Sequence, residues 1–197
     1  MDNPFSKKHI ELLIHAFEQD PMFIKLFKGP RKHRQMNVFF RFIYQRNQLL
    51  SDIYLTDHDI NPSYVCFIEK PKQRVKLSLK ARLKLILRML ALICYIPINS
   101  LNFLSRYDAV TKNQRPKEKN YYLTMIAVSK EKQGLGIGKT IINTIHNMVI
   151  KDPDTHSICL DTENLKNVSY YEHLGYKLTH ESKVNGLSIY HMKKILK

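Results

Sequence analysis

The sequence predicts a single domain of the α/β (α+β) class, and three observations support this. The chain has 197 residues, which is long enough to bury one core and short for two. It is 44% hydrophobic and 25% charged, as globular proteins are and disordered or fibrous chains are not. Helical and strand-like hydrophobic patterns alternate, and one strand-like run leads through a glycine-rich turn into a helical pattern. We therefore treat residues 1–197 as one domain.

The first part of the chain begins with helical patterns. Hydrophobic residues recur at helical spacing between residues 6 and 20, and Pro21 ends the pattern. A second helix is predicted for about residues 35–50. The β-branched and aromatic run over residues 64–68 then predicts a strand.

A basic segment, residues 70–88, follows this strand and contains eight lysines and arginines without an acidic residue. It merges into the apolar stretch 85–98, which is too short to span a bilayer because a span needs about 20 residues. We interpret residues 72–98 as a basic helical insertion that packs an apolar face on the core and leaves its lysines in solvent. A helix lying on a membrane surface is the alternative. Polar residues 105–119 predict a loop.

The second half has clearer signals. A buried strand leads into the glycine turn, a helix resumes after it, and Asn185-Gly186 is typical of a tight hairpin turn. Strands are predicted for residues 121–128, 157–160, 176–181 and 187–195, and helices for the pattern beginning at Ile141 and for residues 168–174.

The charge is strongly positive and unevenly divided. The chain has 32 Lys and Arg against 17 Asp and Glu, a formal charge of +15. Residues 1–119 carry 22 basic and 10 acidic residues, or +12, and residues 120–197 carry 10 and 7, or +3. This balance favours an anionic partner such as nucleic acid, a membrane surface or a phosphorylated cofactor. Aromatic residues do not interleave with the basic run as in a stacking platform for nucleic-acid bases, which argues against nucleic acid. Nucleic-acid or membrane-surface binding is kept as an alternative that we do not favour.

The cysteines and histidines show no metal or disulfide pattern. Cys66, Cys94 and Cys159 are an odd number at spacings that match neither a zinc site nor a disulfide framework. The nine histidines have no metal-ligand spacing, so we expect no metal. The first ten residues lack the apolar core of a signal peptide. We expect a cytoplasmic, reduced protein.

The glycine turn, residues 133–140, has the sequence QGLGIGKT. Glycines at the start of a helix direct several backbone N–H groups into one concavity, where the helix end adds about half a positive charge. A phosphate is the predicted guest. The P-loop pattern fails because Gln133 stands where it needs glycine, and the dinucleotide pattern fails because Lys139 or Ile141 stands there.

Residues 121–176 resemble the GCN5-related N-acetyltransferase (GNAT) superfamily. Its signature, Gln/Arg-x-x-Gly-x-Gly/Ala after a strand, matches Gln133 to Gly138, and an Asn followed seven residues later by Tyr matches Asn164 and Tyr171. Glu172-His173-Leu174-Gly175-Tyr176 and a closing hairpin with Met192 and Ile195 also match. Phe17 with Asp20-Pro21, the strand over residues 121–128, and Thr162 with Asn167 resemble the puromycin-acetyltransferase-like branch.

The resemblance implies a fold and an activity. The expected fold is a mixed, mostly antiparallel central sheet with helices on both faces and a splayed, V-shaped cofactor cleft. Residues 120–197 would be the acetyl-CoA-binding half and residues 1–119 the variable acceptor side. The implied activity is direct transfer of the acetyl group of acetyl-CoA to an amine, and a homodimer is a further expectation.

The resemblance also implies roles for individual residues. Ile126, Ala127 and Val128 match a strand that is usually splayed by a bulge and pairs with pantetheine, and the N–H of Val128 or its neighbour would face the thioester oxygen. Tyr171 matches the general acid, with Tyr170 as the expected core residue. Asn164 and Asn167 would contact the cofactor or cap the short helix. The general base stays open between Glu118, Glu163, and a water relayed through Tyr122 or Thr124. The diphosphate would lie on the N–H groups of Gln133, Gly134, Leu135, Gly136, Ile137, Gly138 and Lys139.

Overall fold

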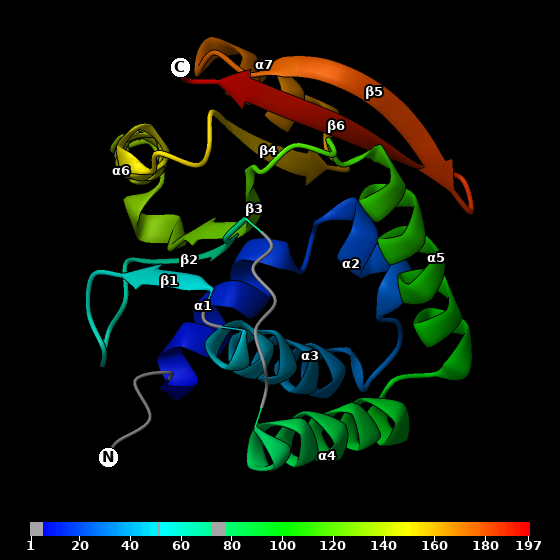
Figure 1. Ribbon diagram of the computed structural model, residues 1–197. Helices are drawn as coiled ribbons and strands as arrows, with labels where there is room; N and C mark the ends of the chain where they lie inside the picture. Colours follow the sequence, from blue (N-terminus) through cyan, green and yellow to red (C-terminus); the bar gives the residue numbers. More distant parts are fainter. Residues whose placement is uncertain (1–5, 51, 72–77) are drawn as a thin grey trace.

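The computed structural model describes residues 6–50, 52–71 and 78–197 (Figure 1). Its helices are α1 (Lys7–Phe17), α2 (Pro21–Leu26), α3 (Lys32–Leu49), α4 (Leu79–Tyr95), α5 (Ile98–Gln114), α6 (Ile137–Lys151) and α7 (Leu165–His173), with a short 3-10 turn at Lys130–Lys132. Its strands are β1 (Ile53–Thr56), β2 (Tyr64–Glu69), β3 (Tyr121–Val128), β4 (Ser157–Thr162), β5 (Lys177–Val184) and β6 (Leu187–Ile195).

The strands form one mixed sheet in the order β1-β2-β3-β4-β6-β5. Only β3 and β4 are parallel, and the other four neighbouring pairs are antiparallel, as the sequence predicted. The β5–β6 hairpin turns at Asn185 and Gly186, whose φ angles of 50° and 79° are both positive, as a type I′ turn requires.

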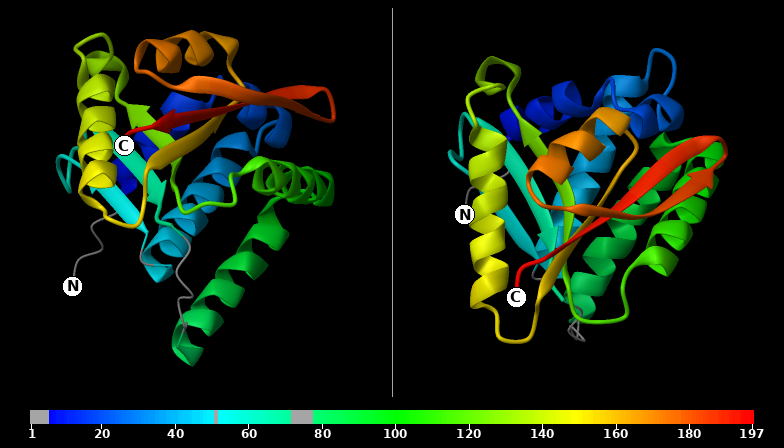
Figure 2. Two further views of the ribbon diagram at one scale, coloured as in Figure 1. Left: turned by 45° about the horizontal axis from the view of Figure 1, so that its top comes forward. Right: turned by 90° about the horizontal axis from the view of Figure 1, so that it is seen from above.

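Helices cover both faces of the sheet (Figure 2). One core packs α1 to α5 against Val65 and Phe67 of β2, and a second packs α6 and α7 against Cys66 and Ile68 of the same strand. Successive side chains of a strand point to opposite faces, so each core occupies one side. The predicted two-faced arrangement is confirmed.

The structure corrects the prediction for residues 105–119. Most of this segment is the second half of α5, not a loop, and its polar residues face solvent while Phe103 and Thr111 are buried. Helix α2 and strand β1 were not predicted. Asp20 and Pro21, which end the first helical pattern, also begin α2, because the Asp20 carboxylate accepts hydrogen bonds from the N–H groups of Met22 and Phe23 at 2.9 and 3.4 Å.

Helix α4 also departs from expectation. Residues 72–77 of the predicted insertion lie outside the described residues. Within α4, only Leu92 is buried, whereas most of its other leucines and isoleucines are exposed, so it does not pack a broad apolar face on the core. Among the described residues, none of the helices combines the length and apolarity needed to cross a membrane.

Candidate active site

The two parallel strands part at the centre of the sheet. β3 pairs with β4 only where Tyr121–Leu123 face Ile158–Leu160, although β3 continues to Val128 and β4 to Thr162. On its other side β3 stays paired with β2 as far as Val128, with one extra residue, Thr124, between Leu123 and Met125. Such a bulge bends a strand. It precedes Ile126, Ala127 and Val128, and it lies where the V-shaped opening between β3 and β4 begins.

The backbone of β3 presents hydrogen-bonding groups to this opening. The N–H of Ser129 donates to Ser63 O at 2.8 Å, so Ser129 faces β2. Residues alternate in the direction of their backbone groups along an antiparallel strand. Ala127 therefore also faces β2, and Ile126 and Val128 face the opening.

The glycine turn carries a run of free backbone donors. Within the described part of the chain, the N–H groups of residues 134–139 donate no hydrogen bond to the protein, and the first one used is that of Thr140, to Gly136 O at 3.0 Å. The turn is open to solvent, with Leu135 at its tip 67% exposed. Six consecutive free donors at the start of the 15-residue helix α6 form a cradle for an anion.

Each glycine of the turn stands at a position where a larger residue would be strained or would make a close contact. Gly134 and Gly136 both have φ of +79°, which costs a residue with a Cβ about 1–2 kcal/mol. Gly138 lies within α6, where an added Cβ would sit 3.0 Å from the Tyr170 hydroxyl. The positive φ that the sequence predicted for this turn is confirmed at Gly134 and Gly136.

A cavity of about 400 Å³ lies beside the opening, between the sheet and the N-terminal helices. Its β3 wall includes Thr124, Met125 and Ile126, and its β4 wall includes Leu160 to Glu163. Tyr171 and Asn167 reach it from α7. Val128 instead lines a neighbouring groove with Gln133, whose side chain donates to Val128 O at 3.2 Å. The exposed edge of β3 thus leads from the cavity towards the glycine turn.

Tyr171 is the buried tyrosine of α7. Its ring is 7% exposed and packs edge-on against Tyr176, with 5.5 Å between ring centroids. Burial raises the pKa of its phenol well above the usual value, so the hydroxyl keeps its proton. The expectation that Tyr170 is the core residue is wrong, since Tyr170 is 43% exposed.

The two asparagines have different surroundings. Asn164 caps α7, with its side-chain oxygen accepting a hydrogen bond from the N–H of Lys166 at 3.0 Å. Asn167 lines the cavity and donates to Thr162 Oγ1 at 3.3 Å. The cap of the short helix is therefore Asn164, and Asn167 faces the cavity where a bound molecule would lie.

Most of the charges near the cavity are paired. Glu69 bridges Arg46 and Arg115 at 3.1 and 2.6 Å; burial would raise its carboxyl pKa, but the two guanidinium groups hold that pKa below its usual value. Asp161 accepts hydrogen bonds from the Tyr122 hydroxyl and from His191, the latter at 2.7 Å. The carboxylates of Glu69 and Asp161 are therefore already engaged by protein groups.

Glu163 and Asp20 are different, because the described residues give neither of them a cation. Burial, and after it the nearby negative charge of Asp20, raise the pKa of Glu163 to about 8, against the lowering effect of a hydrogen bond donated by the Tyr107 hydroxyl. Burial also raises the pKa of Asp20. The cavity thus contains a carboxyl group that changes its protonation state near neutral pH. The sequence offered Glu163 as one of several bases and gave no sign of its burial.

The other candidate bases are less suited by position. Glu118 is an exposed side chain paired with Lys193 and does not line the cavity. The Tyr122 hydroxyl already donates a hydrogen bond to the Asp161 carboxylate. Thr124 lines the cavity, and its Oγ1 atom is buried and has no hydrogen-bond partner in the described structure, so this hydroxyl group is not engaged by the protein. No cluster of three or more metal-ligating side chains occurs in the described residues.

Comparison with protein families now connects this geometry to a known domain. Residues 109–196, which include β3, the glycine turn, α6, β4, α7 and the closing hairpin, match the model of the acetyltransferase (GNAT) domain. Residues 109–196 carry a GNAT acetyltransferase domain. The protein is accordingly an acyltransferase of the N-acetyltransferase type that uses acetyl-CoA as cosubstrate. The puromycin-acetyltransferase-like branch is supported by none of the matches.

Solved structures share the fold over nearly the whole chain. A histone acetyltransferase HPA2 and related acetyltransferase from Corynebacterium glutamicum has a TM-score of 0.68 at 16% identity, covering 99% of this chain and 93% of its own. Arylalkylamine N-acetyltransferase 2 from Aedes aegypti has a TM-score of 0.60 at 14% identity, covering 98% and 96%. The NatB acetyltransferase complex bound to CoA and MES has a TM-score of 0.51 at 14% identity, covering 99% and 98%. A search of curated proteins finds no match.

Proposed function

We propose that the GNAT domain transfers the acetyl group of acetyl-CoA to a small primary amine held in the cavity between β3, β4 and the N-terminal helices. The observation that carries this is the opening between β3 and β4, which has six free N–H donors near one end and a cavity with Tyr171 and Glu163 at the other. Those features fit the diphosphate, the pantetheine arm and the reacting thioester of one extended molecule.

The backbone supplies the binding groups for acetyl-CoA. We assign the diphosphate to the N–H groups of the glycine turn, Gln133 to Lys139, of which residues 134–139 have no protein acceptor. Ile126 and Val128, which face the opening, would pair with the pantetheine amides as an added strand does. Because Ile126 lines the cavity with Tyr171 and Val128 does not, we assign the N–H facing the thioester oxygen to Ile126.

Glu163 and Tyr171 would handle the protons. Glu163 takes one proton from the ammonium group and releases it to solvent, which leaves a lone pair on nitrogen to form the C–N bond. The Ile126 N–H stabilises the negative charge that develops on the thioester oxygen. As the C–S bond breaks, Tyr171 gives its proton to the sulfur, and the remaining extra proton on nitrogen restores the phenol. One proton is released per turnover.

The cavity indicates the class of acceptor. In their ionised forms the carboxyl groups of Asp20 and Glu163 attract a cationic nitrogen, and most of the remaining wall is apolar or aromatic. Its aromatic lining residues are Phe17, Phe23, Phe39, Phe42, Tyr107, Tyr122 and Tyr171. We therefore propose an amine with a compact apolar body, because burying that body against this wall removes apolar surface from water and so favours binding.

Calorimetric binding of acetyl-CoA tests the cofactor site. Gly136→Glu places a Cβ at positive φ and a negative charge in the cradle, and we expect at least about a 100-fold loss of affinity because the carboxylate repels the diphosphate. Gly29→Glu is the matched control, since Gly29 also has positive φ with open space around it and lines none of the cavities described. Equal affinities for the two variants would end the proposal for the diphosphate.

Thiol release from acetyl-CoA with a panel of primary amines tests the chemistry. Tyr171→Phe keeps the packing against Tyr176 and removes the proton donor, so we expect kcat to fall by about 100-fold or more while acetyl-CoA affinity stays within threefold. Tyr170→Phe, on the neighbouring exposed residue, should keep kcat within threefold. If both variants had the same kcat as the wild type, Tyr171 would not be the acid.

A further inference from the structure

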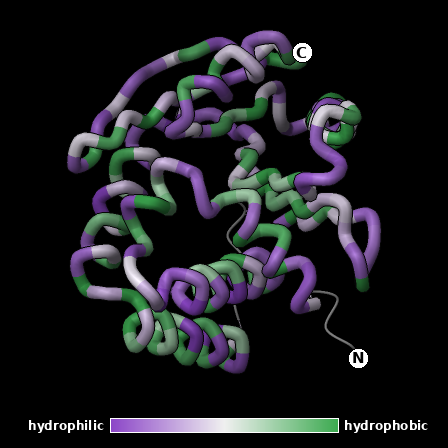
Figure 3. Tube along the Cα trace, turned by 180° about the vertical axis from the view of Figure 1, so that it is seen from behind, coloured by the Kyte–Doolittle hydropathy of each residue, from purple (hydrophilic) through white to green (hydrophobic). Residues whose placement is uncertain are grey.

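Helix α4 exposes a continuous apolar stripe to solvent. Leu79, Leu83, Ile86, Leu90 and Ile93 are 83%, 55%, 53%, 51% and 56% exposed. Their spacing of four, three, four and three residues places all five within about 80° of the helix circumference. Figure 3 shows apolar and polar positions alternating along α4 at the edge of the molecule. Clustered exposed aliphatic side chains of this kind mark interaction sites.

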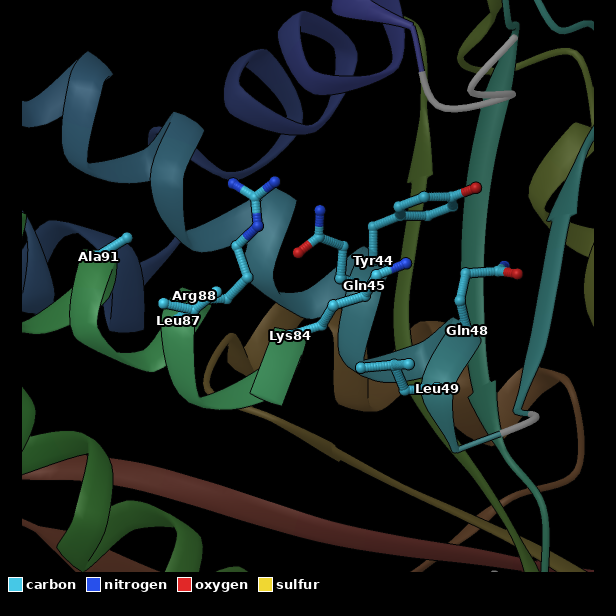
Figure 4. Close-up of a pocket in the computed structure, with 8 residues that line it drawn as sticks. All are labelled: Tyr44, Gln45, Gln48, Leu49, Lys84, Leu87, Arg88 and Ala91. Atoms are coloured by element: carbon cyan, nitrogen blue, oxygen red, sulfur yellow. The ribbon is translucent and has the colours of Figure 1, made fainter. Parts of the chain in front are cut away.

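The side of α4 opposite the stripe is turned towards the protein. Leu92, its buried residue, lies on the side away from the stripe and lines the acceptor cavity. Lys84 and Arg88 line a second cavity of about 530 Å³ between α3 and α4, together with Gln45 and Gln48 of α3 (Figure 4). The helix is therefore fixed to the domain by one side, and the stripe is its free side.

Positive charges flank the stripe. At about 100° per residue, Lys80 and Arg82 lie roughly 100° and 60° to either side of the centre of the stripe, and both are exposed. The sequence contains no acidic residue between Glu69 and Asp108. A surface that covers this stripe must therefore supply negative charge as well as apolar contact.

We propose that α4 docks the enzyme on an anionic phospholipid bilayer, lying in the plane of the interface with its stripe among the acyl chains and Lys80 and Arg82 at the headgroups. Binding is favoured because aliphatic side chains leave water and because basic side chains are attracted to anionic headgroups. A second copy of α4 would bring the same cations without acidic partners. Nucleic acid would accept the cations and leave five aliphatic side chains in water.

Docking in this orientation has a consequence for the site. Because α4 contributes Leu92 to the cavity from its inner side, the bilayer would lie one helix diameter, about 10–12 Å, from the acceptor. An amine that partitions into the interface would then reach the cavity from a locally raised concentration.

Sedimentation with vesicles tests the proposal on the full chain. We expect binding to 70:30 phosphatidylcholine:phosphatidylglycerol vesicles at about 0.1 M salt and at least tenfold weaker binding to pure phosphatidylcholine. Lys80→Glu with Arg82→Glu should weaken binding at least about 30-fold. Lys177→Glu with Lys183→Glu is the control, since it makes the same charge change at exposed positions of β5 and should weaken binding less than threefold.

The apolar contact needs its own variant. Leu83→Gln with Ile86→Gln changes exposed positions, so the fold should persist by circular dichroism, and vesicle affinity should fall more than tenfold. Three results would overturn the proposal: no binding to phosphatidylglycerol vesicles, equal loss in the β5 control, or full binding by the Leu83 and Ile86 variant. A dimer that this variant converts to a monomer, with no vesicle binding by the wild type, would identify the stripe as a self-association surface instead.

Discussion

Replacing Glu163 with glutamine tests how the enzyme prepares its amine. Glu163 faces the acceptor cavity without a cationic partner in the described structure, and burial and Asp20 raise its pKa to about 8. The carboxylate form can accept a proton from an ammonium group, whereas a glutamine amide cannot. The substitution keeps the shape and a hydrogen-bond acceptor for the Tyr107 hydroxyl.

The pKa sets the expected pH dependence. With a pKa of about 8, roughly a tenth of Glu163 is ionised at pH 7. For an amine that titrates near 10, kcat/KM of the wild type should rise about tenfold per pH unit below pH 8 and level off above it. Glu163→Gln should lack this break, and at pH 8.5 its kcat/KM should be lower by about 100-fold or more.

The assay is CoA-thiol release between pH 6 and 9.5 with the best amine of the acceptor panel. Glu118→Gln is the matched control, because Glu118 is an exposed carboxylate paired with Lys193, and its profile should overlay that of the wild type. Acetyl-CoA affinity of Glu163→Gln within twofold of the wild type would show an intact site. If Glu163→Gln kept both the break near pH 8 and wild-type kcat/KM, the base would lie elsewhere.

Three further predictions follow from individual contacts. Asp20→Asn keeps the cap of α2 and removes the negative charge that raises the pKa of Glu163, so the break in the pH profile should move to lower pH, and an upward move would contradict the assignment. Gly136→Ala forces an alanine to φ near +79° and should lower the free energy of unfolding by about 1–2 kcal/mol in urea titrations; no change would mean that the turn relaxes freely. Burial and Lys194 lower the pKa of His146 to about 4 from 6.5, so the unfolded chain binds more protons between these values and stability should fall as pH drops from 6.5 to 4. His146→Gln should lose up to about 2 kcal/mol less over that range, and identical losses would contradict the assigned pKa.

The local features of the site could be predicted from sequence because they depend on neighbouring residues. The alternation of Gly134, Gly136 and Gly138 after a strand was enough to predict the anion cradle, and the left-handed φ that glycine reaches most easily occurs at Gly134 and Gly136. The Asn185-Gly186 turn was predictable for the same reason. By contrast, the high polarity of residues 105–119 led to a wrong prediction of a loop. Most of this segment belongs to a helix that buries only a narrow face, with Phe103 and Thr111.

The sequence by itself located the glycine turn that we predict to bind phosphate, and it determined where the strands and helices of that half lie. Only the tertiary structure decided which of two adjacent tyrosines is buried, which acid faces the cavity without a cation, and which side of α4 stays in water. Burial, pKa and exposure depend on residues far apart in the chain: Glu163 responds to Asp20 and Tyr107, and the stripe of α4 is free because α3 occupies the opposite side. Those relations come from packing, which no local pattern records.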